Sequence, residues 1–190
     1  MNIILFGPPG SGKGTQADKI SKEFNLHKIS TGDLLREEIK KKSSLGNKIK
    51  DLVDKGTFVS DEIINNLIES IFLNKSYNNN FIFDGYPRTL IQAKNLDDLL
   101  RKYNQKIDIV LKLSVSLEIV KKRILQRQTE EKRADDNEEI AIKRFKTYEK
   151  SSEPVLDYYK QSNLLKVVNG EARISEINSE ISGFIDTIKG

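Results

Sequence analysis

The segment Gly7-Pro8-Pro9-Gly10-Ser11-Gly12-Lys13-Gly14-Thr15 follows the apolar run Ile3-Ile4-Leu5-Phe6 directly and precedes a helix-forming stretch that reaches Phe24. A strand, a glycine-rich turn and a helix in this order form the setting of a phosphate-binding loop. Glycines allow the tight curl that points several backbone N–H groups into one concavity. The helix N-terminus contributes partial positive charge at that point, and Lys13 contributes a full charge. We therefore predict that residues 7–15 bind phosphate.

One position of this loop departs from the strict pattern. Ser or Thr normally follows the lysine and places its hydroxyl on Mg²⁺, whereas Gly14 stands here and Thr15 comes next. We expect phosphate binding without that direct contact between hydroxyl and metal. The alternative is a turn that is merely rich in glycine, but the lysine and both flanking elements argue against it.

Composition limits the class of protein. The 190 residues suffice for one domain with a real core. No run approaches the roughly 20 apolar residues that a membrane span needs, and a strand at the very start leaves no room for a signal peptide. The chain has no cysteine, which excludes disulfides and thiolate metal sites. We expect a cytoplasmic protein, monomeric and without a membrane partner.

Charge and histidine content narrow the range of functions further. The net charge of +4 arises from 32 basic and 28 acidic residues that are interspersed along the chain. This pattern is typical of a solvated surface and argues against nucleic acid as a partner. The single histidine, His27, is expected at the surface or at a strand edge, so a reaction that needs an imidazole base has little support.

Apolar runs alternate with helical patterns along the whole chain. Strands are predicted at 3–6, 26–29, 81–83, 107–113 and 164–168. Because these runs are mostly apolar rather than alternating with polar residues, they indicate a parallel sheet that helices cover on both faces. We predict an α/β protein with a three-layer P-loop fold and a central five-stranded parallel sheet. Ligands of such sheets bind beyond the carboxyl ends of the strands.

The segments between these strands suggest how the chain is divided. Residues 30–59 contain short helices joined by small loops, with Thr31 or Asp33 as the first cap, and we expect them to form a small helical subdomain that moves as a unit. Residues 126–136 carry almost no apolar side chain beyond 127, which predicts an exposed loop, and the next helix is expected to break at Pro154. The core then comprises 1–29, 60–125 and 137–190.

Two charged residues follow the third predicted strand. Asp84 stands where P-loop enzymes place a carboxylate that holds Mg²⁺ or its waters; the alternative is an aspartate that only forms a turn before Gly85. Arg88 comes just after Tyr86-Pro87, and the proline is expected to aim it at the same crevice.

Arginines cluster around the polar segment. Arg123 and Arg127 are four residues apart and share one helix face, Arg133 lies within the segment, and Arg144 lies on the returning helix. Guanidinium groups bind phosphate oxygens in pairs and keep their charge at any pH, so this segment is predicted to fold onto a polyphosphate. A solvated basic hairpin is the alternative. Asp135 and Asp136 would orient these arginines or cap the helix beside Asn137.

Four stretches of the chain together resemble one family. They are Gly7 to Gln16, Ser-Thr-Gly-Asp-Leu-Leu-Arg at 30–36, Phe-Asp-Gly-Tyr-Pro-Arg at 83–88 with Gln92, and Arg-Ala-Asp-Asp-Asn at 133–137. In this order, from residue 3 to about residue 175, they are similar to the adenylate kinases, a family of nucleoside monophosphate kinases. The glycine after the lysine is what that family carries, so the departure at Gly14 supports the resemblance.

The resemblance implies two nucleotide sites. The implied ATP site consists of Gly10, Ser11, Gly12, Lys13, Gly14, Thr15, Arg123, Arg127 and Ala172. The implied AMP site consists of Thr31, Arg36, Thr57, Phe58, Val59, Gly85, Tyr86, Pro87, Arg88, Gln92, Arg133 and Arg144. The implied catalytic charges are Lys13, Arg88, Arg127, Arg133 and Arg144. Asp84 would hold Mg²⁺ through water, and the segment 126–136 would be the short form of the family's lid, without a structural zinc.

The implied reaction is ATP + AMP ⇌ 2 ADP, with ATP, AMP and ADP as the small-molecule partners. Within this interpretation Thr31 and Gln92 would select adenine in the acceptor. A UMP/CMP kinase of the same family is one alternative, although it typically lacks the pair Ser30-Thr31 together with Gln92. A P-loop module that senses nucleotides without transferring phosphate is another, but it would need fewer arginines. A nucleic-acid binder is the third.

Overall fold

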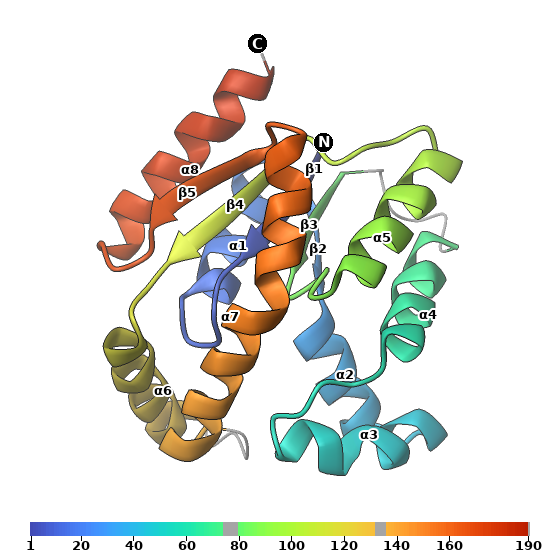
Figure 1. Ribbon diagram of the computed structural model, residues 1–190, viewed down its shortest axis with the longest axis vertical. Helices are drawn as coiled ribbons and strands as arrows, with labels where there is room; N and C mark the ends of the chain where they lie inside the picture. Colours follow the sequence, from blue (N-terminus) through green and yellow to red (C-terminus); the bar gives the residue numbers. More distant parts are fainter. Residues whose placement is uncertain (74–79, 132–135, 190) are drawn as a thin grey trace.

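The computed structural model describes residues 1–73, 80–131 and 136–189 (Figure 1). Its elements in chain order are β1 (Asn2–Phe6), α1 (Lys13–Glu23), β2 (His27–Ser30), α2 (Thr31–Lys40), α3 (Ser44–Asp54), α4 (Asp61–Phe72), β3 (Phe81–Asp84), α5 (Leu90–Lys102), β4 (Ile109–Ser114), α6 (Leu117–Glu131), α7 (Glu138–Gln161), β5 (Leu165–Asn169) and α8 (Ile174–Lys189). Within these ranges no helix combines the length and the apolar character that crossing a bilayer requires.

The strands form the predicted five-stranded sheet in the order β2-β3-β1-β4-β5, and every pair is parallel. β1 lies at the centre, with Ile4 opposite Phe83 on one side and Val110 on the other. Parallel strands point their carboxyl ends to one edge of a sheet. The loop after β1, the start of α2 and Asp84 at the end of β3 therefore meet at that edge.

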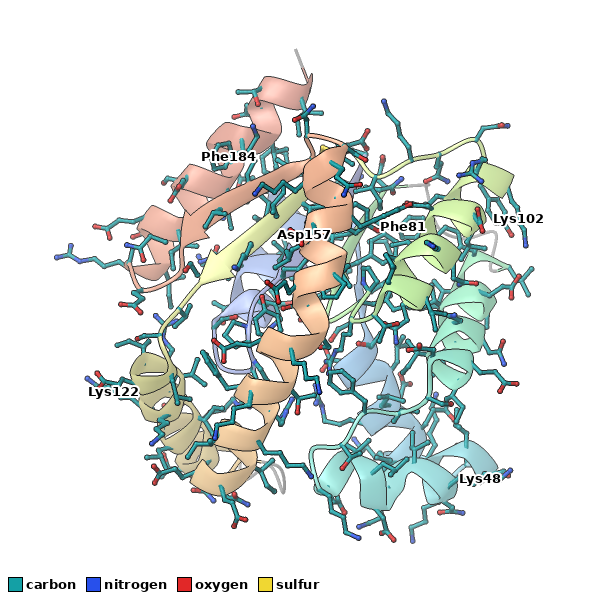
Figure 2. All side chains as sticks on the ribbon, viewed as in Figure 1. Lys48, Phe81, Lys102, Lys122, Asp157 and Phe184 are labelled. Carbon is teal, nitrogen blue, oxygen red and sulfur yellow. The ribbon has the colours of Figure 1, made fainter. Side chains whose placement is uncertain are left out.

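Helices cover both faces of the sheet, which explains the apolar strands. Ile4 and Phe6 pack in one core cluster with residues of α4, α5 and α7, whereas Ile3 and Leu5 pack in the other with residues of α1 and α8. Figure 1 shows α7 in front of the sheet and α1 behind it. In Figure 2 Phe81 points into the interior beside α5, where it is 2% exposed. The three predicted layers are confirmed.

The helix α2 begins differently from the prediction. The N-cap is Ser30, whose Oγ accepts a hydrogen bond of 3.3 Å from the backbone N of Asp33; neither Thr31 nor Asp33 caps this helix. A cap needs extended backbone, and Ser30 still has it as the last residue of β2. Thr31 and Asp33 already lie inside the helix, which frees both side chains for other contacts.

Two other boundaries correct the prediction. α6 continues to Glu131 rather than ending at 126, because its polar residues are good helix formers and Gln126 Nε2 donates to Glu130 Oε1 at 3.1 Å. α7 runs through Pro154 without a break. Pro154 is exposed, as is Lys150, whose carbonyl loses its partner, while Val155 and Leu156 beside Pro154 are buried in the core. Packing of these neighbours offsets the roughly 3 kcal/mol cost of an internal proline.

Candidate functional site

The loop between β1 and α1 is curled onto its own lysine. Gly12 caps α1 in the left-handed conformation, with φ 94° and ψ 8°, where a side chain would be strained. The Nζ of Lys13 donates to the carbonyl oxygens of Gly7 at 2.6 Å and Pro8 at 2.9 Å. The ammonium group is therefore held over the loop, beside the first backbone N–H groups of α1. This is the geometry of a phosphate-binding loop.

The loop lines a cavity of about 650 Å³ at the carboxyl ends of β1, β2 and β3. The predicted loop residues in its wall are Gly10, Ser11, Gly12, Lys13, Gly14 and Thr15. Basic side chains of this wall come from several elements: Lys13, Lys28, Arg36, Arg88, Arg123, Arg127 and Arg144. The acidic side chains of the wall are Asp18, Asp33, Asp84 and Glu130. Positive charge dominates, as a polyphosphate ligand requires.

A second, smaller cavity lies between α2, α4 and the start of α5. Its wall contains these predicted residues: Thr31, Arg36, Thr57, Phe58, Val59, Gly85, Arg88, Gln92 and Arg144. Apolar neighbours such as Leu35 and Ile64 complete it. A third small cavity, which Tyr86 and Pro87 help to line, lies against the phosphate loop. Gly85, Arg88 and Arg144 belong to the walls of all three cavities, so they stand where the two main cavities meet.

Arg88 is fixed in place at this meeting point. Its Nε donates to the carbonyl oxygen of Gly85 at 2.8 Å, and its guanidinium lies 5.3 Å from the centre of the Phe58 ring. Burial, and the positive charge of Arg144 after it, lower the pKa of Arg88 to about 10. Arg88 still carries its charge at neutral pH, and it faces a region that lacks enough negative charge to balance it.

Lys13 experiences the same surroundings. Burial lowers its pKa to about 8, the carboxylate of Asp84 opposes this change, and the charges of Arg88 and Arg144 add to it. An ammonium group with a lowered pKa beside arginines favours an incoming anion, which restores its charge balance.

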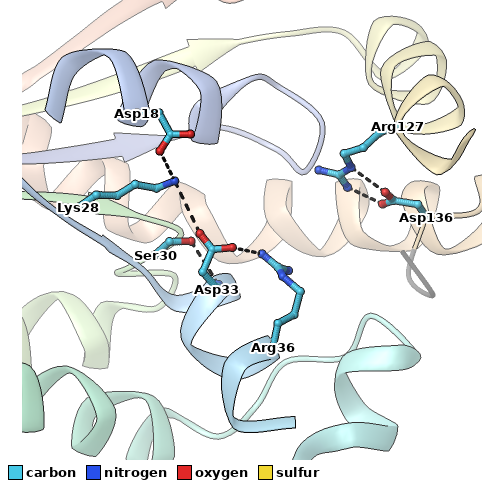
Figure 3. A network of polar contacts seen from close by, with 7 residues as sticks. All are labelled: Asp18, Lys28, Ser30, Asp33, Arg36, Arg127 and Asp136. Atoms are coloured by element: carbon cyan, nitrogen blue, oxygen red, sulfur yellow. Dashed lines mark hydrogen bonds and ion pairs between the residues drawn. The ribbon is translucent and has the colours of Figure 1, made fainter. Parts of the chain in front are cut away.

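Carboxylates contact three of the other basic groups, Arg36, Lys28 and Arg127 (Figure 3). Asp33 lies between Arg36 and Lys28: its Oδ1 accepts from Arg36 at 2.6 Å, and its Oδ2 is 3.7 Å from Lys28 Nζ. These contacts lower the pKa of Asp33, against the effect of burial. Asp136 is fully buried and accepts two hydrogen bonds from Arg127, one of them 2.6 Å long. The prediction that Asp135 and Asp136 orient arginines is confirmed for Asp136, while Asp135 lies outside the described residues and Asn137 caps α7.

The remaining predicted residues have different positions. Arg123 NH1 donates to the carbonyl oxygens of Ser11 at 3.1 Å and Gly170 at 2.9 Å, which ties α6 to the phosphate loop. Ala172 packs against the core cluster beneath α1 and α8, and the large cavity is lined instead by Ile174; contact of Ala172 with ATP stays a prediction. Arg133 lies outside the described residues.

Some residues of the site had no clear signal in the sequence. Asp33 and Lys28 line the large cavity. The sequence carried a signal only for Asp33, through its position within the Ser-Thr-Gly-Asp stretch. Asp61 contacts Gln92 in the wall of the second cavity, and nothing in its local sequence indicated this.

The oxygen donors near the loop fit a hard divalent ion. Asp84 lies so close to the loop that a Cβ on Gly14 would be 3.7 Å from its Oδ2. One carboxylate next to a phosphate site is the usual arrangement for Mg²⁺, which takes its other ligands from phosphates and water. Among the described residues no group of three or more His, Cys, Asp or Glu is arranged to hold a metal.

The parallel sheet, the loop after β1 and the adjoining cavities define a nucleotide-binding P-loop kinase, which is a transferase. The model of the family described as "Adenylate kinase" matches residues 5–164. The chain belongs to the adenylate kinase family.

Relatives over the full length agree with this assignment. An adenylate kinase of Pelagibacter ubique is 43% identical over 208 aligned residues, which cover 96% of this chain and 98% of the relative. An adenylate kinase of Archaeoglobus fulgidus is 37% identical, with both chains covered completely. One of Xanthomonas campestris pv. campestris is 43% identical, covering 95% of this chain and 97% of its own.

Proposed function

We propose that the chain catalyses the reaction of its family, the reversible transfer of the terminal phosphoryl group of ATP to AMP, which yields two ADP. The observation that carries this proposal is the shared wall of the two main cavities. Gly85, Arg88 and Arg144 border both, so substrates in the two cavities would meet at these residues. A module that only senses one nucleotide has no use for a second cavity that opens on the first.

The donor would lie in the large cavity and the acceptor in the small one. Lys13 and the loop amides would bind the β- and γ-phosphates of ATP, and Arg123 and Arg127 would add charge from α6. Arg36 and Arg88 would bind the phosphate of AMP, with the base between apolar residues and Gln92. Arg144, and Arg133 by resemblance, would neutralise the group in transfer.

This reaction needs no general base. The attacking oxygen belongs to the phosphate of AMP and is already anionic near neutral pH. The protein must align two polyanions and neutralise the equatorial oxygens of the transferred group. The only histidine, His27, begins β2 and packs edge-on against Phe81, which agrees with a mechanism based on charge and positioning.

Mg²⁺ is the proposed cofactor, with Asp84 holding it through water. Bound to ATP, the ion would neutralise phosphate charge and orient the oxygens for in-line transfer. Asp84 faces the loop from the end of β3, so its carboxylate would hold the ion there through water.

Two parts of the chain would close over the substrates and exclude water, which prevents hydrolysis of ATP. They are the subdomain 30–59 and the lid 126–136, on a core of 1–29, 60–125 and 137–190. A small hydrophobic cluster between α6 and α7, which includes Ile124 and Phe145, is separate from the two clusters that pack on the sheet. It supports this division because the helices on either side of the lid pack against each other independently of the main core. We also propose a monomer in the cytoplasm.

An acceptor panel tests the proposed function. Purified protein with ATP and Mg²⁺ is expected to form ADP with AMP present, and to do so much faster than with CMP, UMP or GMP. Chelation of the metal is expected to abolish turnover. A preference for CMP or UMP would instead identify a pyrimidine nucleotide kinase, and ATP binding without transfer to any acceptor would identify a sensing module.

The lowered pKa of Lys13 predicts a proton linkage. ATP binding restores the charged ammonium, so above pH 8, where the free protein has lost that proton, binding takes up a proton and weakens as pH rises. We expect ATP affinity to fall several-fold between pH 8 and pH 9, as titration calorimetry would measure. In Lys13→Arg the guanidinium stays charged over this range, so its affinity should be flat; a fall of equal size in the variant would contradict the assignment.

A further inference from the structure

The side-chain amide of Gln92 is held at both ends. Its Oε1 accepts a hydrogen bond of 2.7 Å from the backbone N of Arg88, and its Nε2 donates one of 2.8 Å to Oδ1 of Asp61. Gln92 is 3% exposed, and its own backbone N donates to the Thr89 hydroxyl that caps α5. Neither backbone nor side chain has room to rearrange without losing a partner.

These two contacts leave the amide only one orientation. Turning it by 180° would point Oε1 at the Asp61 carboxylate and Nε2 at the Arg88 N–H. The first contact pairs two acceptors and the second pairs two donors, and both would be repulsive. A carboxamide has two N–H groups and an oxygen with two lone pairs. In the observed orientation it therefore keeps one donor and one acceptor, at fixed positions, for a ligand of the cavity that it lines.

The orientation matters for purine recognition. Adenine offers a donor at its 6-amino group and an acceptor at N1, whereas guanine offers an acceptor at O6 and a donor at N1. A carboxamide that pairs with adenine in a given binding pose would have to rotate by 180° to pair with guanine in the same pose. A free carboxamide could serve either base, while a locked one serves only one of them.

We propose that Asp61 is a positioning residue that locks the Gln92 amide and thereby makes the acceptor site select AMP over GMP. This inference rests on the proposed function, because it takes AMP as the acceptor. Asp61 lines neither main cavity and would act through Gln92, from the first turn of α4. The carboxylate matters because it can only accept: an amide in its place could accept or donate and would remove one of the two contacts that oppose the turned orientation, leaving only the Arg88 N–H to oppose it.

A matched pair of variants tests this role. Asp61→Asn and Glu62→Gln each remove one negative charge from the first turn of α4 without changing side-chain size, and Glu62 is exposed. We expect Asp61→Asn to lower the ratio of kcat/KM for AMP over GMP at least roughly threefold, part of the discrimination that one well-made base contact provides, because the Arg88 N–H still opposes the turned orientation. Glu62→Gln is expected to leave the ratio unchanged. Asp61→Ser, whose hydroxyl can accept or donate, should behave like Asp61→Asn.

A double-mutant cycle separates positioning from general stability. In a Gln92→Ala background the change Asp61→Asn should have no further effect on the ratio, because the group it orients is gone. Thermal unfolding, measured alongside, should show similar small shifts for Asp61→Asn and Glu62→Gln. A ratio that stays at the wild-type value in both folded Asp61 variants would overturn the inference while leaving the function intact. A wild-type protein that does not phosphorylate AMP would overturn the proposed function and this inference with it.

Discussion

Lys13→Ala is expected to lower kcat at least roughly 100-fold, the usual cost of removing one charge that stabilises a transition state. The ammonium group is held over the loop by the carbonyls of Gly7 and Pro8. From there it would follow the phosphoryl group as negative charge shifts during transfer. Because burial already lowers its pKa to about 8, the free site gains more from an added anion than a solvated lysine would.

Steady-state kinetics with saturating ATP and AMP would measure this effect. Lys19→Ala is the matched control, since Lys19 is an exposed lysine of the same helix α1. This variant should keep the kcat of the wild-type protein. Circular dichroism and thermal unfolding would establish that Lys13→Ala is folded although it loses the two loop contacts. Near-normal turnover by a folded Lys13→Ala protein would remove this residue from the mechanism.

Arg88→Ala should reduce kcat to a similar extent, at least roughly 100-fold. Arg88 lies in the wall of both main cavities and is braced by Gly85 and Phe58, so its charge is positioned before substrates bind. Arg88→Lys should recover only part of the activity, because an ammonium group cannot bind two phosphate oxygens as a planar guanidinium does.

Arg88→Ala has a second expected result that distinguishes it from Asp61→Asn. The hydrogen bond to Gln92 comes from the backbone N of Arg88 and survives the substitution. Turnover should therefore fall for AMP and GMP alike, with their ratio retained. Arg101→Ala, an exposed arginine of α5 whose pair with Asp98 lies in solvent, serves as the control. Loss of discrimination in Arg88→Ala, or a comparable loss of turnover in Arg101→Ala, would contradict the assigned role.

Much of the fold could be predicted because its signals are local. Mostly apolar runs such as 81–83 and 107–113 gave the strands, and their spacing with helical segments gave a parallel sheet. The predictions for α7 and α6 failed, the first because packing decided the outcome and the second because helix propensity was underestimated. Pro154 does not break α7 because buried Val155 and Leu156 hold the helix in place, and α6 extends to Glu131 because polar residues with high helix propensity do not mark a loop.

The candidate site likewise combines residues that local sequence signals could predict with residues that only the folded structure brings together. Asp84 is the last residue of β3 and Arg88 lies in the turn after it, so their place at the edge of the sheet could be read from the sequence. Ala172 was inferred from resemblance alone, and the large cavity is lined by Ile174 two residues later. Asp61 and Gln92 lie on different helices and are 31 residues apart in the chain, a separation at which no sequence pattern predicts contact.

The sequence by itself determined the phosphate loop. All its parts, from Gly7 to Thr15, are neighbours in the chain, and glycine dihedrals, the helix N-terminus and Lys13 act within a few residues of one another. Only the tertiary structure decided what faces that loop. Parallel strands are connected through helices, so Gly85, Arg88 and Arg144 reach one wall, and Asp61 reaches Gln92, only after the sheet is assembled and both its faces are covered.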